Sequence, residues 1–369
     1  MFGTILISVC TVMHVYVFWR AASIPFVERH ISGKTVMNTG LILWAVFFFG
    51  RIMGHSGTGI PAAILEFSGM NWMAMLFLTF IPLLLTDLIT LFGFFMPRLS
   101  ASLRGFAVLI GILLSVIALV QGLRPPMVEK YKVTLPGLPD ALDGTVIVAL
   151  SDMHLGSQLG KVWLSDRIAQ VKEQKPDLVL LLGDIFEGHG PPEDQLIDPF
   201  KQLSATYGLW AVPGNHEFYG GNKMNLFESA GFTLLNNEWV EVRPGLVLAG
   251  VEDLTTRSRN GQTSDPISHA LTGRPPGATI LLSHTPWEAE KAAGKGVGLM
   301  LSGHTHGGQI WPFGYLVRKR YPLLEGRYPV DGMTAIICRG TGTWGPRMRL
   351  WHPGQILHVT LRTEKGSRN

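Results

Sequence analysis

The sequence predicts an α/β domain with largely parallel central strands, preceded by an all-α transmembrane region of about four helices. Two observations predict this architecture. Hydrophobic residues concentrate in the first third of the chain, and further along short apolar runs alternate with helical patterns. A third observation concerns function, because five of the apolar runs are each followed directly by polar side chains that can bind metals.

The charge of this 369-residue chain is unevenly distributed. Residues 1–127 contain three acids and seven Lys or Arg, whereas residues 128–369 contain 24 of each sign, so the net charge of +4 belongs to the N-terminal third. Nucleic-acid enzymes usually present a basic catalytic face, so this balance disfavours a nucleic-acid partner. Cys10 and Cys338 lie far apart and indicate neither a disulfide framework nor a cysteine zinc site.

Four apolar stretches approach the length needed to cross a bilayer. They cover residues 1–19, 36–50, 70–96 and 105–122. The first lacks a basic start and a small-residue cleavage site, so we expect an uncleaved anchor rather than a signal peptide. The chain is therefore expected to be an integral protein of a bacterial inner membrane or a plasma membrane.

Charged residues around these spans bear on topology and on function. The connections between spans one and two and spans three and four hold five Lys or Arg, against four on the other side, which leans toward an extracytoplasmic C-terminal domain. His14 and Asp87 fall inside spans, where ionisable groups are expensive and are candidates for function. Each of these two residues could have a transport or proton-relay role, or a structural role in contact with a neighbouring helix.

The domain boundary follows the last span, because Pro125 and Pro126 cannot continue a helix. We expect a transmembrane region over residues 1–123, a linker over 124–132 and the α/β domain over 133–369. Helical patterns occupy residues 162–174, 195–205 and 222–230. Two strand-like runs near the end, at residues 333–338 and 355–362, suggest a second, partly antiparallel sheet.

The candidate ligands each follow one apolar run, at residues 145–150, 178–182, 209–212, 279–282 and 297–301. They should therefore lie just past the carboxyl ends of strands, where open α/β sheets bind their ligands. Seven side chains, enough for two metal ions, are available there: Asp152, His154, Asp184, Asn215, His284, His304 and His306.

The ligand types and their spacing indicate a dinuclear metal centre. Asp152 and His154, at positions i and i+2 of an extended backbone, would point to one side, and His304 and His306 repeat that spacing. Carboxylate and amide oxygens with imidazole nitrogens suit two divalent ions, with manganese favoured over iron, zinc and magnesium. Asp184, the lone aspartate at its strand end, is the expected bridge between them.

Such a centre suits phosphoester hydrolysis, because two metals clamp the phosphoryl oxygens and lower the pKa of a bridging water. His216, next to Asn215, is placed to stabilise or protonate the leaving oxygen. Any one of these histidines alone is more often a core or turn residue, and it is the joint pattern that favours a site. His189 is a further candidate for substrate contact.

At these residues the chain resembles the calcineurin-like metallophosphoesterase superfamily. The motifs Asp-x-His, Gly-Asp, Gly-Asn-His-Asp/Glu, His and Gly-His-x-His occur here in the family's order over residues 144–308. The resemblance implies a four-layer αββα sandwich of two mixed sheets. It also implies one metal held by Asp152, His154, Asp184 and His306, a second held by Asp184, Asn215, His284 and His304, and His216 as the catalytic histidine.

Two further segments refine the resemblance. Residues 340–343 and 346–350 look like the C-terminal signature of the membrane-associated bacterial branch, although Pro353 and Gly354 stand where that branch carries Pro-Glu. Glu217 replaces the commoner aspartate after the catalytic histidine and keeps a carboxylate that can orient His216.

The combined expectation is a membrane-anchored dinuclear-metal hydrolase. It would cleave a phosphodiester, pyrophosphate or monoester, with a lipid-linked substrate favoured by the membrane region, through attack of a metal-bridging hydroxide. The alternatives are a non-catalytic scaffold of the same fold and a membrane transporter fused to a hydrolase. The residue pattern leaves the ester class and the oligomeric state open.

Overall fold

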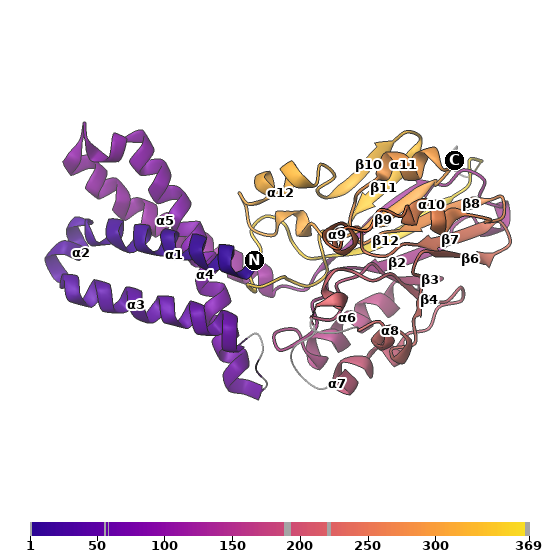
Figure 1. Cartoon of the computed structure of the whole chain (residues 1–369), viewed down its shortest axis with the longest axis horizontal. Coiled ribbons are helices and arrows are strands. Elements are labelled where there is room, and N and C mark those ends of the chain that lie inside the picture. The colour runs from indigo at the N-terminus through magenta and orange to yellow at the C-terminus, as the bar shows by residue number, and fades with distance from the viewer. Residues whose placement is uncertain (1, 55–56, 58, 188–192, 220–222, 366–369) are drawn as a thin grey trace. The chain divides into compact units, whose positions relative to one another are not determined.

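The computed structural model describes residues 2–54, 57, 59–187, 193–219 and 223–365 (Figure 1). The chain forms two compact units. The helical unit contains residues 1–123 together with Gly345–Trp351, and the sheet unit contains residues 124–344 and 352–369. Each unit is described separately below.

Four long apolar helices dominate the helical unit, as the sequence predicts. They are α1 (Phe2–Ala22), α3 (Gly33–Phe49), α4 (Gly59–Ile89) and α5 (Pro97–Leu123), with the shorter α2 (Pro25–His30), η1 (Gly50–Gly54) and η2 (Leu91–Gly93) between them. All four are long and apolar enough to cross a membrane, the second span including η1. Helix α5 begins before the apolar run because Pro97 suits a first helical turn, where no N–H partner is needed.

The two ionisable groups of the spans have partners within the helical unit. Asp87 is fully buried, and its carboxylate accepts hydrogen bonds from Tyr16 Oη at 2.6 Å and Arg104 Nε at 2.9 Å. Arg20 Nε lies 2.5 Å from Asp87 Oδ2, the oxygen that also accepts from Tyr16. His14 Nε2 lies 2.8 Å from the carbonyl oxygen of Gly40. These contacts fit the structural reading of both residues, because each joins separate helices.

The sheet unit contains two six-stranded mixed sheets. The first has the order β1-β12-β2-β3-β4-β5, with strands Met127–Thr134, Gln355–Arg362, Val146–Leu150, Leu178–Leu181, Leu209–Ala211 and Thr233–Leu234. The second has the order β10-β11-β9-β8-β7-β6, with strands Gly326–Val330, Met333–Ile337, Leu299–Ser302, Ala278–Leu282, Leu246–Gly250 and Glu238–Arg243. In both sheets the central strands that precede the candidate ligands are parallel to one another.

Three apolar cores stack these elements into four layers. Alternate residues of β2 enter different cores, with Ile147 and Ala149 between the sheets and Val148 and Leu150 under the helices of the first sheet. Those helices are α6 (Lys161–Glu173), α7 (Glu193–Ile197) and α8 (Asn225–Ser229), while α10 (Pro266–Leu271) and α11 (Ala289–Gly294) cover the second sheet (Figure 1). The predicted α/β sandwich behind an all-α region is thus confirmed.

The remaining helices of the sheet unit are short and lie in connections: α9 (Leu254–Arg259), α12 (Gly314–Arg320), η3 (Asp140–Leu142), η4 (Phe200–Gln202), η5 (His216–Phe218) and η6 (His306–Gly308). The helix expected over residues 195–205 is divided into α7 and η4. Residues 162–174 form α6 almost as predicted, and the helix expected at 222–230 shortens to α8.

The third span is the helix α4, residues 59–89, and not residues 70–96 as expected. The structure differs from the expected segment boundaries in three further places. Most of the expected linker is strand β1, because residues 127–134 pair in parallel with β12. Strands β11 and β12, expected in one sheet, lie in different sheets. Residues 345–351 belong to the helical unit, where the Arg349 N–H donates to the Ala118 carbonyl at 2.9 Å and the Trp351 N–H donates to Gln121 Oε1 at 2.8 Å.

Replacing Asp87 tests its structural role. Asp87→Ala leaves two buried guanidinium groups without their carboxylate, and removing one partner of a buried ion pair costs about 3–5 kcal/mol. We expect a clearly lower thermal unfolding midpoint for the detergent-solubilised full chain. Glu28→Ala, which removes an exposed acid of the same unit, is the control. Equal midpoints for the two variants would contradict a structural role and revive the transport reading.

Candidate metal centre

All seven predicted ligands lie at the carboxyl ends of strands, as expected. Asp152 and His154 follow β2, Asp184 follows β3, and Asn215 follows β4 in the first sheet. In the second sheet His284 follows β8, while His304 and His306 follow β9. Six of the seven are buried and His304 is half-buried, so the two sheets bring their ligands together at one sheltered place.

The backbone that carries these ligands is left-handed rather than extended. The φ angle is 51° at Asp152 and 49° at His154, so the expected extended Asp-x-His geometry is wrong. Asp184, His304 and His306 also have positive φ, at 53°, 71° and 51°. Non-glycine residues adopt this region at a cost of roughly 1–3 kcal/mol each, and they cluster at functional sites. The side chains converge because the chain turns sharply at each strand end.

Two glycines allow the strand ends to approach closely. A Cβ on Gly183 would lie 2.6 Å from the backbone nitrogen of Gly214 and 2.8 Å from His284 Nδ1. On Gly214, a Cβ would lie 2.9 Å from Asp184 Cγ. Neither gap admits a side chain, so glycine is required at both positions.

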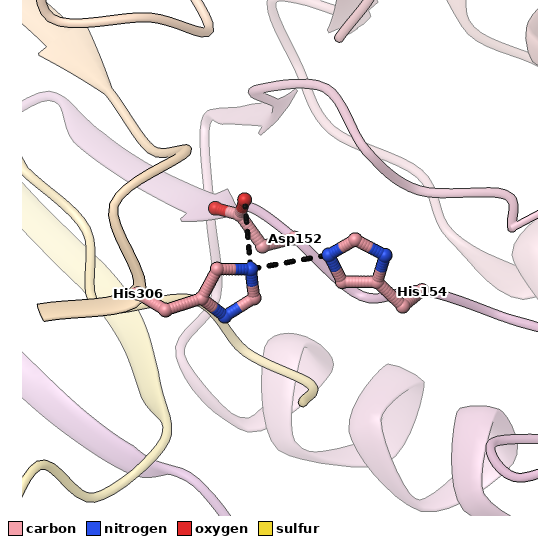
Figure 2. A group of neighbouring side chains, drawn as sticks. All are labelled: Asp152, His154 and His306. Carbon is pink, nitrogen blue, oxygen red and sulfur yellow. Dashed lines mark hydrogen bonds and ion pairs between the residues drawn. The ribbon is translucent and has the colours of Figure 1, made fainter. Parts of the chain in front are cut away.

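The first ligand group contains Asp152, His154 and His306 (Figure 2). The Nε2 atoms of His154 and His306 lie 3.1 Å apart, and His306 Nε2 lies 3.4 Å from Asp152 Oδ1. Figure 2 shows the His306 ring facing both partners. Two ligands on one octahedral ion, at right angles and with bonds of about 2.1 Å, would lie about 3 Å apart.

A second group contains Asp184, His284 and His304. His284 Nε2 lies 3.2 Å from Asp184 Oδ2 and 3.1 Å from His304 Nδ1. His284 Nδ1 lies 2.8 Å from the Leu182 carbonyl oxygen, which can only accept a hydrogen bond. That bond places a proton on Nδ1, so Nε2 is the nitrogen that faces the group and would bind a metal ion.

Asp184 connects the two groups, because it also clusters with His154 of the first group and with His216. Burial lowers the pKa of His304, and neighbouring His284 lowers it further, to about 3. A neutral His304 can offer Nδ1 as a ligand while its Nε2, 2.8 Å from Tyr321 Oη, holds the proton. The arrangement therefore supplies lone pairs to two adjoining positions.

Three observations fit divalent metal ions to this site. The ligand atoms are spaced as they would be on shared ions, as described above. Asn215 Oδ1 is buried and accepts no hydrogen bond from the described residues, a loss that costs about 1–3 kcal/mol if nothing compensates it. No Lys or Arg of the described chain forms an ion pair with Asp152 or Asp184, so imidazoles, backbone N–H groups and the Ser151 hydroxyl are their neighbours and no fixed cation balances their charge.

Glu217 has a different role from the one expected. Its carboxylate does not reach for His216 but accepts four backbone hydrogen bonds, from the amides of Asp184 at 3.0 Å, Ile185 at 2.8 Å, Phe186 at 3.1 Å and Gly214 at 2.7 Å. The side chain is fully buried. Glu217 therefore ties the turn after β3 to the turn after β4.

Glu187 is the carboxylate that holds His216. Its Oε2 makes a short contact with His216 Nδ1 and lies 3.5 Å from His154 Nδ1. Burial lowers the pKa of His216, but Glu187 and Asp184 raise it more strongly, to about 9. Burial raises the pKa of Glu187, yet His216 and His154 hold it well below its usual range. An imidazolium paired with a carboxylate results.

Sequence reasoning missed Glu187, Tyr219 and Tyr321. Glu187 carried a usable signal, since it stands three residues after Asp184 in the same turn. Tyr219 Oη accepts from Asn215 Nδ2 at 3.2 Å, and an aromatic residue four positions after the amide could have been noted. Tyr321 directly follows three basic residues and carried no such signal. His189, the predicted substrate contact, lies outside the described residues.

Comparison with known proteins agrees with this geometry. The family model described as calcineurin-like phosphoesterase matches residues 145–308. A metallophosphoesterase of Helicobacter pylori is 33% identical over 274 residues, which cover 73% of this chain and 69% of that protein. A metallophosphoesterase of Aquifex aeolicus is 34% identical over 244 residues, covering 64% of this chain and 91% of the relative.

A vertebrate relative shows that the similarity extends beyond bacteria. The "transmembrane protein with metallophosphoesterase domain" of Danio rerio is 32% identical over 271 residues, covering 69% of this chain and 62% of that protein. The match to the family model, the extent of the bacterial similarity and the fold all agree with the ligand pattern. The chain belongs to the calcineurin-like metallophosphoesterases and is a metal-dependent hydrolase of phosphoesters.

Proposed function

We propose that this chain is a membrane-anchored phosphoesterase with a dinuclear metal centre. One metal would be held by Asp152, His154, Asp184 and His306, and the second by Asp184, Asn215, His284 and His304. Manganese is the favoured ion, because the set combines carboxylate and amide oxygens with imidazole nitrogens and contains no thiolate. When bound, two such ions supply a metal-bridging hydroxide as nucleophile and polarise the phosphoryl oxygens.

The observation that carries this proposal is the convergence of two ligand groups that are linked through Asp184. In each group imidazole nitrogens approach another ligand atom to 3.1–3.4 Å. Neighbouring lone pairs at such distances repel one another unless a proton or a cation lies between them. The scaffold alternative would require that ligands be lost, and the sequence retains all seven predicted ligands.

His216 is the proposed general acid. Its Nδ1 is held by Glu187, so Nε2 is the nitrogen that would deliver a proton to the leaving oxygen. The negative charges of Glu187 and Asp184 favour the protonated ring that this role needs. The Asp184 carboxylate also accepts the backbone N–H of His216 at 2.7 Å, which couples the position of the acid to the proposed bridging ligand.

The substrate is proposed to be a lipid-linked phosphoester in an inner or plasma membrane. Four apolar helices keep the hydrolase at a bilayer, where substrates with acyl or isoprenoid chains are concentrated. The connections between spans one and two and between spans three and four hold five Lys or Arg, against four on the other side. This excess supports an extracytoplasmic catalytic unit. The bacterial relatives support a bacterial inner membrane.

Asp184→Asn tests the shared ligand, because it keeps the shape of the side chain and removes the charge. We expect hydrolysis of bis(p-nitrophenyl) phosphate with manganese to fall at least about a thousand-fold. Bound manganese, measured by elemental analysis, should fall from about two ions per chain. Asp166→Asn, which changes an exposed aspartate on α6, is the control. Full activity and metal content in Asp184→Asn would refute the assigned centre.

Replacing His216 tests its acid role through the leaving group. A general acid contributes roughly 10²–10⁴-fold, and most where the leaving oxygen is strongly basic. We therefore expect His216→Ala to lose far more activity on an alkyl phosphoester than on a p-nitrophenyl ester. Glu187→Gln should show the same selectivity to a smaller degree. An equal loss on both substrates would assign His216 to binding or folding instead.

A reporter fused after Asn369 tests the proposed side of the membrane. Alkaline phosphatase, which is active outside the cytoplasm, should be active in this position, whereas a cytoplasmic fluorescent protein should not fluoresce. Charge reversal of Arg29 and Lys34, both exposed in the helical unit, should weaken the preference because the margin is a single charge. The opposite reporter pattern would place the catalytic unit in the cytoplasm.

A further inference from the structure

Helix α12 (Gly314–Arg320) is an exposed segment whose role the hydrolytic centre does not explain. The side chains of Tyr315 and Leu316 are 64% and 56% exposed, and Phe313 just before the helix is 43% exposed. The helix ends with three exposed cations, Arg318, Lys319 and Arg320. In Figure 1, α12 lies apart from the helices that cover the two sheets.

This composition is typical of segments that lie in a membrane interface. Aromatic and aliphatic side chains enter the boundary between headgroups and acyl chains, and neighbouring Lys and Arg attract anionic lipids. A soluble polyanion would satisfy the cations but not the exposed Tyr315 and Leu316. A neutral protein surface would satisfy the apolar residues but not three adjacent positive charges. An anionic bilayer satisfies both.

Both ends of the segment lie close to the turn after β9, which carries the candidate ligands His304 and His306. At its start, a Cβ on Gly314 would lie 3.2 Å from the carbonyl oxygen of Gly307, the residue after His306. Just past its end, Tyr321 Oη lies 2.8 Å from His304 Nε2. A molecule held on α12 is therefore positioned relative to the metal centre itself.

A cation and two aromatic rings connect the basic end of α12 with that centre. The guanidinium of Arg320 lies 4.3 Å from the ring centroid of Trp287, and Trp287 stacks on Tyr321 with centroids 5.5 Å apart at an angle of 17°. This stack fixes the guanidinium beside the residue that contacts His304. A headgroup phosphate bound by Arg320 would lie beside the stacked rings that connect to His304.

We propose that α12 inserts into the surface of an anionic leaflet and passes phospholipid-type headgroups to the metal centre. The chain has four apolar helices of spanning length, so its sheet unit is tethered at a bilayer and meets lipid at a high effective concentration. Membrane insertion of α12 stands by itself. Delivery of the headgroup rests on the proposed function.

Insertion is tested by fluorescence quenching on the full chain reconstituted in lipid nanodiscs. A Leu316→Cys variant labelled with the dye NBD should be strongly quenched by doxyl-labelled lipids in discs containing phosphatidylglycerol. The native Cys10 and Cys338 are buried and should label poorly. Val162→Cys on α6, which is 79% exposed, is the matched control and should be quenched little. Equal quenching at the two positions, or none at either, would overturn insertion.

Delivery is tested by a double variant, Arg318→Gln with Lys319→Gln. Each cation near an anionic surface is worth about a five-fold change in affinity. Loss of two should therefore raise KM by about twenty-five-fold for a chromogenic phosphoester carried on an acyl chain in phosphatidylglycerol vesicles, with kcat unchanged. KM for the water-soluble ester should change less than about two-fold. Lys172→Gln with Lys175→Gln, exposed cations of the sheet unit, is the control.

The outcomes separate this inference from the proposed function. A rise in KM for both substrates would place Arg318 and Lys319 in general anion binding and overturn delivery from the membrane. Unchanged KM for the acyl-chain substrate would overturn it as well. If no phosphoester is hydrolysed at all, the proposed function fails, while the quenching experiment still decides whether α12 enters the bilayer.

Discussion

The carboxylate of Glu217 holds together the turns that carry the candidate metal ligands Asp184 and Asn215. It accepts four backbone N–H groups from the ends of β3 and β4, and the candidate ligands Asp184 and Asn215 lie within those turns. Without it, four buried donors would lose their acceptor, at about 1–3 kcal/mol each. The backbone of both ligands is therefore fixed by the protein and not only by a metal. Glu217, which was expected to orient His216, instead fixes the backbone of the two turns.

The surrounding structure stabilises an unfavourable backbone conformation at the candidate ligands. Five candidate ligands are non-glycine residues in the left-handed region, which together costs several kcal/mol. Strands β2, β3, β8 and β9 behind them are buried on both faces and enter three apolar cores, which resist relaxation of the strand ends. The strain is thus located at the ends of fully buried strands.

The sequence was informative where a local pattern of residue types was enough to identify a strand or a ligand position. Apolar runs predicted the parallel strands, and the residues that follow them predicted the position of every candidate ligand. It was uninformative where the outcome depends on which distant segments meet. Strands β11 and β12 read alike but join different sheets, residues 345–351 pack with the helical unit, and Glu187 rather than Glu217 contacts His216. Left-handed turns were missed because any non-glycine residue adopts this region only rarely, although Asp and His do so more often than most.

Two buried aspartates of this chain show how partners decide what a carboxylate does. Asp87 is matched by the guanidinium groups of Arg20 and Arg104, whose charges cannot be withdrawn, so it serves to hold helices together. Asp184 has no such partner among the described residues and is surrounded by His216, His284 and backbone amides. An imidazole can be neutral, so these neighbours need not cancel the negative charge of Asp184. That charge is then available to a metal ion that exchanges with solvent. The same residue type is structural in one unit and a candidate metal bridge in the other because of this difference in its neighbours.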